Sequence, residues 1–196
     1  MLHSKQEKTV VLIKPDGVKR GLIGEIISRI ERRGLKIIAC KMLWATESQI
    51  DGHYPKDDDY IKTLGGKSLG SYEKYGINPM DEMGTDDGYK IGKEVRSWLV
   101  SGMTEGPIIK MAVEGIHAIE MVRKIVGKTI PAMAEMGTIR GDFSVDSPDL
   151  ANKEKRALKN LAHASGDTYE AEHELAYWFS PEEIHDYKRA EEDIMF

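Results

Sequence analysis

The sequence predicts an α/β protein of the α+β type, in which helices cover a four-stranded antiparallel sheet. Short, β-branched apolar runs predict the strands, and apolar residues at helical spacing predict the helices between them. In chain order these signals run strand, helix, strand, strand, helix, and a fourth short strand is expected near 142–145. This order suits antiparallel pairing as well as parallel pairing, and the complete βαββαβ series is the ferredoxin-like plan.

Each predicted element has its own signal. The first strand ends at the turn residues Lys14-Pro15-Asp16-Gly17, and glycines close both helices, at Gly34 and Gly127. The first helix places isoleucines at positions i, i+3, i+4 and i+7, which gives it one apolar face. The expected bounds are strand 9–13, helix 23–34, strand 35–44, strand 107–113 and helix 117–126. The third strand is expected to end at Glu114 and Gly115.

We expect one domain over 1–196, with insertions at about 55–105 and 146–159. The first of these is rich in Gly, Asp, Lys and Tyr, and only 91–100 has a clear helical pattern, so we interpret it as an elaborated surface insertion. Its run Asp57-Asp58-Asp59 lacks the alternating spacing of a calcium loop and is interpreted as a solvated loop.

Composition narrows the classes of function. The formal net charge of −5 argues mildly against nucleic acid as the main partner, because binding to a nucleic-acid backbone shows as a basic excess, although a local basic cleft can still lie within an acidic chain. The single cysteine, Cys40, excludes an intramolecular disulfide and suits a reducing compartment; its apolar neighbours predict that it is buried. Residues 1–13 hold no signal-peptide core and no run approaches a membrane span, so we expect a cytoplasmic protein without a membrane partner.

Motif spacing excludes several phosphate and metal sites. Two triplets, Gly66-Lys67-Ser68 and Gly127-Lys128-Thr129, end like a P-loop but lack the earlier glycine. No residue spacing fits a zinc site, and no protein-bound metal is predicted. Three cations beside turns, Lys14, Arg123 and Arg140, could instead form a phosphate-binding cleft together with a reactive histidine.

The chain resembles the nucleoside diphosphate kinases. The segments that carry the resemblance follow one another in the family's order. They are T-V-V-L-I-K-P-D-G-V-K-R-G-L-I-G-E-I-I (9–27), H-Y (53–54), G-P-I-I-K-M-A-V-E-G (106–115), V-R-K-I-V-G-K-T-I-P (122–131), G-T-I-R-G-D-F (137–143), N-L-A-H-A-S (160–165) and E-L-A-Y-W-F-S-P-E-E (174–183). The resemblance implies a Mg²⁺-dependent transferase that moves the γ-phosphate of a nucleoside triphosphate to a nucleoside diphosphate. It also implies a ping-pong mechanism and a homo-oligomer, most often a hexamer.

The resemblance also implies a role for each matching residue. His163 is the nucleophile that becomes a phosphohistidine, Glu174 orients its imidazole, and Tyr54 and Ser165 lie close to it. Lys14 and Asn160 bind the sugar hydroxyls, with Lys14 also near the transferred phosphate, and Arg123, Thr129 and Arg140 hold the β- and γ-phosphates.

The chemistry of these residue types agrees with the implied roles. An unperturbed imidazole has a pKa of about 6.5, so it is largely neutral near pH 7 and can attack phosphorus. A carboxylate bonded to one ring nitrogen fixes the tautomer and stabilises the charge that develops. His163 is preferred to His173, because His173 directly precedes Glu174 and adjacent helix residues do not share a face.

Some positions depart from the family pattern. Asp57 stands where the family often has a second histidine, and the carboxylate after Ser165 is displaced by one residue, to Asp167. The residue that stacks on the base is either near 59–61 or Val95, with Trp98 nearby. Two other functions stay open at this point: a histidine-dependent protein phosphotransferase and a non-catalytic nucleotide-binding protein on the same fold.

Overall fold

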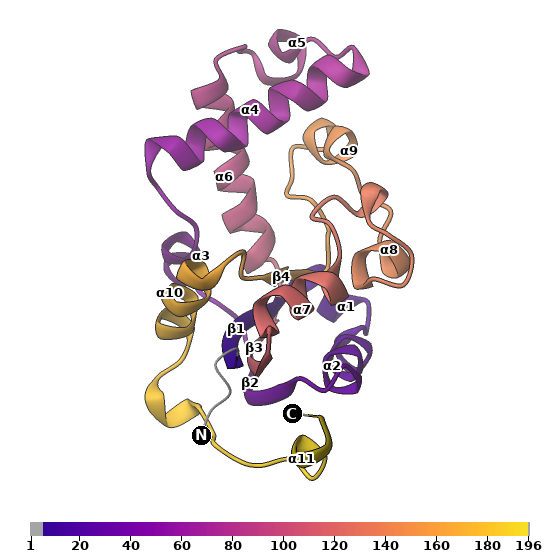
Figure 1. The fold of residues 1–196 in the computed structure, drawn as a ribbon. Helices are drawn as coiled ribbons and strands as arrows, with labels where there is room; N and C mark the ends of the chain where they lie inside the picture. The colour runs from indigo at the N-terminus through magenta and orange to yellow at the C-terminus, as the bar shows by residue number, and fades with distance from the viewer. Residues whose placement is uncertain (1–5, 196) are drawn as a thin grey trace. The chain divides into compact units, whose positions relative to one another are not determined.

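A computed structural model describes residues 6–195 (Figure 1). The expectation about the N-terminal segment therefore lies partly outside the described residues, since 1–5 precede them. The chain divides into two compact units, each of which is described by itself. Unit 1 holds residues 6–44, 106–144 and the chain from 160 onward, and unit 2 holds 45–105 and 145–159. Both predicted insertions fall entirely in unit 2; the single-domain organisation stays a prediction.

Unit 1 is built on one four-stranded sheet with the order β2-β3-β1-β4. Its strands are β1 (Gln6–Ile13), β2 (Lys36–Leu43), β3 (Ile108–Ile116) and β4 (Ala162–Ala164). Every neighbouring pair is antiparallel, and β1 lies between β3 and β4. The predicted ferredoxin-like fold with a four-stranded antiparallel sheet is therefore confirmed.

Helices cover this sheet. The helical elements of unit 1 are α1 (Pro15–Lys19), α2 (Ile23–Arg32), α7 (Ala118–Val126), α8 (Ile139–Phe143), α10 (Thr168–Trp178) and α11 (Glu192–Met195), with 3₁₀ turns η1 (Pro131–Met133) and η2 (Pro181–Glu183). The inner faces of α2 and α7, including Ile26 and Val122, pack with Val11 of β1 in one buried core. Val10, which alternates with Val11, is also fully buried, and α10 packs against β1.

Three predictions about the strands of unit 1 are wrong. The segment expected to form the fourth strand holds the end of α8 and the residues that follow it, because Thr138 caps a helix there by accepting a hydrogen bond from the Gly141 amide; the fourth strand is β4. β3 continues through Glu114, whose carboxylate pairs with Lys36 at 3.2 Å across the strands. Cys40 is exposed, because β2 is an edge strand and an irregularity near Ala39 interrupts its alternation.

Unit 2 is helical, with α3 (Glu47–His53), α4 (Asp58–Tyr75), α5 (Pro79–Met83), α6 (Gly88–Thr104) and α9 (Pro148–Lys153). The helix predicted at 91–100 is confirmed as part of α6, whereas the expectation that the rest of the insertion lacks clear helices is wrong. Asp57 begins α4 as its N-cap by accepting a hydrogen bond from the Tyr60 amide at 2.9 Å, so the aspartate run is a helix start and not a loop. Gly66-Lys67-Ser68 lies inside α4 and forms no phosphate loop.

Glycines bring α4 and α6 into close contact. A side chain on Gly65 would overlap the carbonyl oxygen of Gly88, and one on Gly92 would overlap that of Ile61. These glycines are therefore a requirement of the helix crossing and not a sign of loop structure. No helix among residues 6–195 is long and apolar enough to cross a membrane.

Candidate active site

His163 lies at the centre of the short strand β4, opposite Leu12 of β1. The residue two positions earlier, Leu161, has a left-handed backbone with φ of 70°. Its carbonyl accepts a hydrogen bond from the Lys14 amide at 2.8 Å, and its own amide donates to Asp16 Oδ2 at 2.9 Å. Two hydrogen bonds from the turn after β1 thus fix Leu161, a residue with a strained backbone two positions before His163. Strained backbone of this kind is common at functional sites.

A chain of hydrogen bonds fixes the imidazole of His163. Nε2 lies 2.7 Å from Glu174 Oε1, and Ser165 Oγ donates to Glu174 Oε2 at 2.7 Å. Ser165 in turn accepts from the Val10 amide at 3.2 Å, and both Ser165 and Glu174 are buried. With its Nε2 proton donated to Glu174, a neutral His163 carries its acceptor lone pair on Nδ1.

Three cations lie near this imidazole. Burial lowers the pKa of His163 below its ordinary value, and the charges of Lys14, Arg140 and Arg123 lower it further, while Glu170 opposes them. The imidazole is therefore neutral at pH 7, which is the form that can act as a nucleophile.

Lys14 and Asn160, which share a predicted role, are joined by a hydrogen bond. Lys14 Nζ donates to Asn160 Oδ1 at 2.7 Å, and Asn160 Nδ2 donates to the Thr129 carbonyl at 2.9 Å. Burial lowers the pKa of Lys14 to about 8, partly opposed by Asp16. Lys14 is thus charged at neutral pH but close to its titration range.

Arg140 is tied to the backbone on three sides. Its Nε, Nη1 and Nη2 atoms donate to the carbonyls of Asn160, Gly127 and Ala162 at 3.1, 2.7 and 2.5 Å. The guanidinium is buried, and burial and then Arg123 lower its pKa to about 10, so it stays charged at neutral pH.

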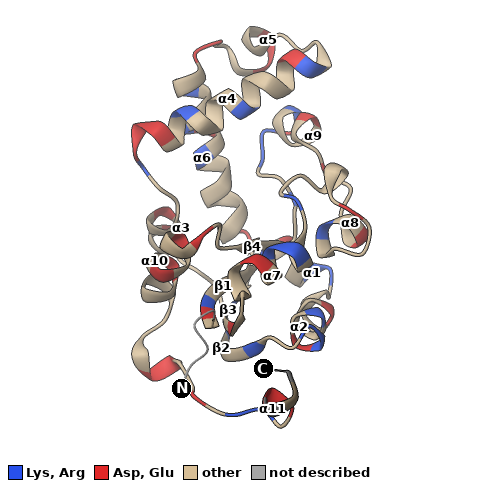
Figure 2. Ribbon diagram, viewed as in Figure 1, with Lys and Arg blue, Asp and Glu red and all other residues tan. Residues whose placement is uncertain are grey.

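Arg123 contrasts with Arg140. It lies on the exposed side of α7 and has no hydrogen-bond or ion-pair partner among residues 6–195, so its guanidinium is available to an anion. Figure 2 shows basic residues on α7 and α8, and α7 packs against β4 within unit 1. Unit 1 therefore brings together His163, Glu174 and Ser165 with the predicted cations and with Thr129 and Asn160.

Tyr54 belongs to unit 2. It follows α3, and Arg96 of α6 donates to its carbonyl at 2.9 Å while pairing with Asp51 at 2.7 Å. That Tyr54 lies beside His163 stays a prediction. Asp57, at the position of the family's second histidine, is engaged as the α4 cap.

Sequence reasoning missed Glu170. Its carboxylate accepts a hydrogen bond from the Gly166 amide in the loop that follows β4, and its own amide donates to Asp167 Oδ1 at 2.9 Å. The displaced Asp167 is therefore the N-cap of α10. The reciprocal spacing of Asp167 and Glu170 resembles a capping box and could have signalled this contact.

His173 is exposed on α10, where its ring stacks between Tyr169 and Tyr177 with 6.4 Å between ring centroids on each side. It lies on a different face of the helix from Glu174, which is buried. The preference for His163 over His173 therefore has a geometric basis.

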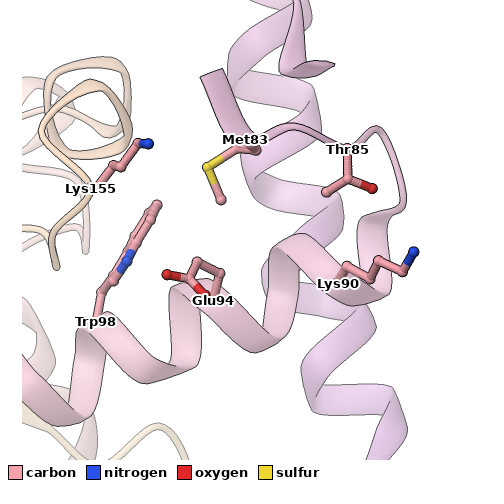
Figure 3. Close-up of a pocket in the computed structure, with 6 residues that line it drawn as sticks. All are labelled: Met83, Thr85, Lys90, Glu94, Trp98 and Lys155. Carbon is pink, nitrogen blue, oxygen red and sulfur yellow. The ribbon is translucent and has the colours of Figure 1, made fainter. Parts of the chain in front are cut away.

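Unit 2 also has a cavity of about 250 Å³ beside α6 (Figure 3). Its lining residues are Met83, Thr85, Lys90, Glu94, Trp98 and Lys155. Figure 3 shows Trp98 and Lys155 on one side and Met83 facing them. None of the predicted catalytic residues lines the cavity. Trp98, which does line it, is close in sequence to Val95, one of the two alternatives for the residue that stacks on the base.

Comparisons with known proteins agree with this geometry. The family model for nucleoside diphosphate kinase matches residues 7–62 and 88–184. A nucleoside diphosphate kinase of Pyrobaculum aerophilum is 49% identical over 178 residues, which cover 91% of this chain and 97% of that protein. One of Archaeoglobus fulgidus is 37% identical and covers 97% of each chain.

Solved structures give the same result. An NDP kinase from Pyrobaculum aerophilum superposes with a TM-score of 0.90 at 46% identity, covering 92% of this chain and all (100%) of that one. A transition-state mimic of the Borrelia burgdorferi nucleoside-diphosphate kinase, with bound vanadate and ADP, gives a TM-score of 0.78 at 36% identity, covering 97% of this chain and 96% of that one. Since the family model matches most of the chain and these relatives span nearly all of it, the chain belongs to the nucleoside diphosphate kinase family.

Proposed function

We propose that this chain transfers the γ-phosphate of a nucleoside triphosphate to a nucleoside diphosphate through a phosphohistidine on His163. The observation that carries the proposal is the 2.7 Å contact between His163 Nε2 and Glu174 Oε1, supported on the far side by Ser165. This contact orients the ring and leaves Nδ1 as the nucleophilic atom. The family of the chain supports the same reaction.

The proposed reaction has two balanced halves. Nδ1 of His163 attacks the γ-phosphorus, the bond from this phosphorus to the β,γ-bridging oxygen breaks, and the diphosphate leaves. A second diphosphate then attacks the phosphohistidine by the reverse route. Lys14, Arg123 and Arg140 stabilise the charge on the transferred group, and Glu174 stabilises the charged imidazole.

Mg²⁺ fits this site as part of the nucleotide. The carboxylate that reaches His163 is already bonded to His163 and Ser165, and Asp16 accepts from the Leu161 amide. The remaining charged groups proposed to bind phosphate are cations, which repel a metal ion unless phosphates carry it. We therefore treat Mg²⁺ as an ion bound to the substrate phosphates, where it neutralises charge in the reacting group.

The test of the proposal is a two-stage labelling experiment. The protein is incubated with γ-labelled ATP, freed of nucleotide and then mixed with several nucleoside diphosphates. We expect an acid-labile phosphoprotein whose label passes to each diphosphate. Binding without phosphoprotein would favour the non-catalytic alternative, and label that passes only to a protein acceptor would favour the protein phosphotransferase.

We also propose that the chain forms a homo-oligomer, a hexamer as in the family, and acts in the cytoplasm. Part of the edge strand β2 is covered, since the backbone amide of His185 donates a hydrogen bond to the Ile38 carbonyl at 2.8 Å. Beyond this point Met42 and Trp44 are 54% and 66% exposed. An exposed edge with large apolar side chains supports pairing with a second copy. The single cysteine supports the reducing compartment.

A further inference from the structure

Glu170 connects the first turn of α10 to the loop that leaves β4. Its carboxylate accepts the Gly166 amide proton, and its backbone amide donates to Asp167 Oδ1 at 2.9 Å. The loop from Ser165 to Asp167 is thus bound to α10 at Gly166 and at Asp167. A loop whose backbone amide is bound by a side-chain oxygen has a better defined conformation than one held only by chain connectivity.

This loop contains the serine that supports Glu174. Ser165 Oγ donates to Glu174 Oε2 at 2.7 Å, and Glu174 Oε1 lies 2.7 Å from His163 Nε2. Glu170 and Glu174 are one turn apart on α10 and therefore share a helix face. Glu174 contacts the nucleophile itself, whereas Glu170 holds the neighbouring loop.

Gly166 is matched to Glu170. A Cβ on Gly166 would collide with Glu170 Oε2, while the next nearest atom, Arg123 Nη1, would be 3.5 Å away, an ordinary contact distance. The backbone of Gly166 is not left-handed, so alanine is compatible with its conformation. The carboxylate of Glu170 is thus the obstacle to a side chain at this position.

We infer that Glu170 is a positioning residue for phosphoryl transfer, which acts through the Gly166 amide to hold Ser165 and, through Ser165 and Glu174, the imidazole of His163. This inference rests on the proposed phosphohistidine reaction. In this role residue 170 must offer an oxygen that accepts the Gly166 amide proton, and its negative charge matters less. It also requires that residues 166 and 170 act as one unit.

Four variants test the inference: Glu170→Ala, Glu170→Gln, Gly166→Ala and the double variant Gly166→Ala/Glu170→Ala. The measurement is the single-turnover rate of histidine phosphorylation by ATP, with the affinity for ATP and the unfolding temperature measured in parallel. We expect Glu170→Ala to lower the maximal rate about tenfold, which corresponds to about 1.4 kcal/mol, with little change in ATP affinity. Glu170→Gln keeps an acceptor oxygen and should stay within about threefold of the unchanged protein.

Non-additivity is the decisive readout. Because an alanine at 166 displaces the same carboxylate that Glu170→Ala removes, the double variant should be no slower than either single variant. Losses that multiply in the double variant, a normal rate in Glu170→Ala, or a loss that follows the unfolding temperature would each overturn the inference. A failure of the unchanged protein to phosphorylate would overturn the proposed function itself and this inference with it.

Discussion

In the proposed reaction His163 acts as a neutral imidazole held by one buried carboxylate, so the two histidines near this carboxylate should behave differently. His163→Ala should abolish phosphoprotein formation, a loss on the order of 10⁶-fold, as when other covalent nucleophiles are removed. His173→Ala removes only an exposed ring between two tyrosines and should keep activity within about twofold. Label incorporation from ATP measures both variants, and a dead His173→Ala variant would contradict the assignment.

The titration of His163 and Lys14 should shape the pH dependence of kcat/KM. His163 must be neutral, so its lowered pKa places the acid limb below the value of about 6.5 for a free imidazole. Lys14 must be protonated, so activity should fall as the pH rises through about 8. Steady-state rates measured from about pH 4 to about pH 10 check both limbs.

Lys14→Arg gives a control for the alkaline limb. A guanidinium keeps its charge across this range, so whatever activity the variant retains should no longer fall near pH 8. An unchanged alkaline limb in this variant would assign the titration to another group.

At the scale of elements, two adjacent glycines of α4 should respond oppositely to the same change. Gly65→Ala introduces a Cβ that overlaps the Gly88 carbonyl of α6 and should lower the free energy of unfolding by about 1–3 kcal/mol. Gly66→Ala meets nothing within 4 Å on an exposed side of the same helix and should raise it by about 0.5–1 kcal/mol. Urea titration followed by circular dichroism measures both, and equal signs would contradict the crossing geometry.

The same glycines explain where sequence reasoning failed. The long helices of unit 2 are hard to predict because they contain glycines, which are typical of loops. Gly65 and Gly92 instead allow α4 and α6 to cross closely, and no local sequence pattern reveals such a crossing. β4 has only three residues, too few for any periodicity, so the strand was expected elsewhere. The strands and helices with apolar runs or helical spacing, such as β1, α2 and α7, were predicted because burial imposes those patterns.

The candidate site was predictable to the extent that its residues lie in recognisable motifs. His163 contacts Glu174, the residue expected to orient it, and Asn160 lies within hydrogen-bond distance of Lys14, with which it shares a predicted ligand. Glu170 was missed because its contact depends on the conformation of the loop at Gly166, which spacing alone does not fix. Tyr54 lies in unit 2, and its predicted role stays untested.

At the scale of the whole molecule, the net charge of −5 describes the average and not the site. Unit 1 gathers Lys14, Arg123 and Arg140 around one imidazole, and the charges of all three lower the pKa of that imidazole. An acidic chain can thus present a local anion site, since fields near a cleft depend on nearby charges. The expectation that nucleic acid is not the main partner stays a prediction.

Assembly should depend on the edge of the sheet. Met42→Lys, near the end of β2, and Trp44→Lys, just after it, place charges on the exposed edge and should reduce the mass measured by light scattering, because a buried unpaired charge is costly. Tyr169→Lys changes a side chain that is 81% exposed on α10 and should leave the mass unchanged. A monomeric starting protein of 22.0 kDa would contradict the assembly proposal.

The two arginines proposed to bind phosphate differ in how much of the surrounding structure depends on them, and so in what a substitution at each position would report. Arg140 joins three stretches of backbone, at Gly127, Asn160 and Ala162, before any nucleotide arrives, whereas Arg123 joins none among the described residues. Loss of activity after replacing Arg140 would therefore mix damage to the framework with loss of a phosphate ligand. Only at Arg123 can the contribution of a guanidinium to the reaction be measured separately from its contribution to folding.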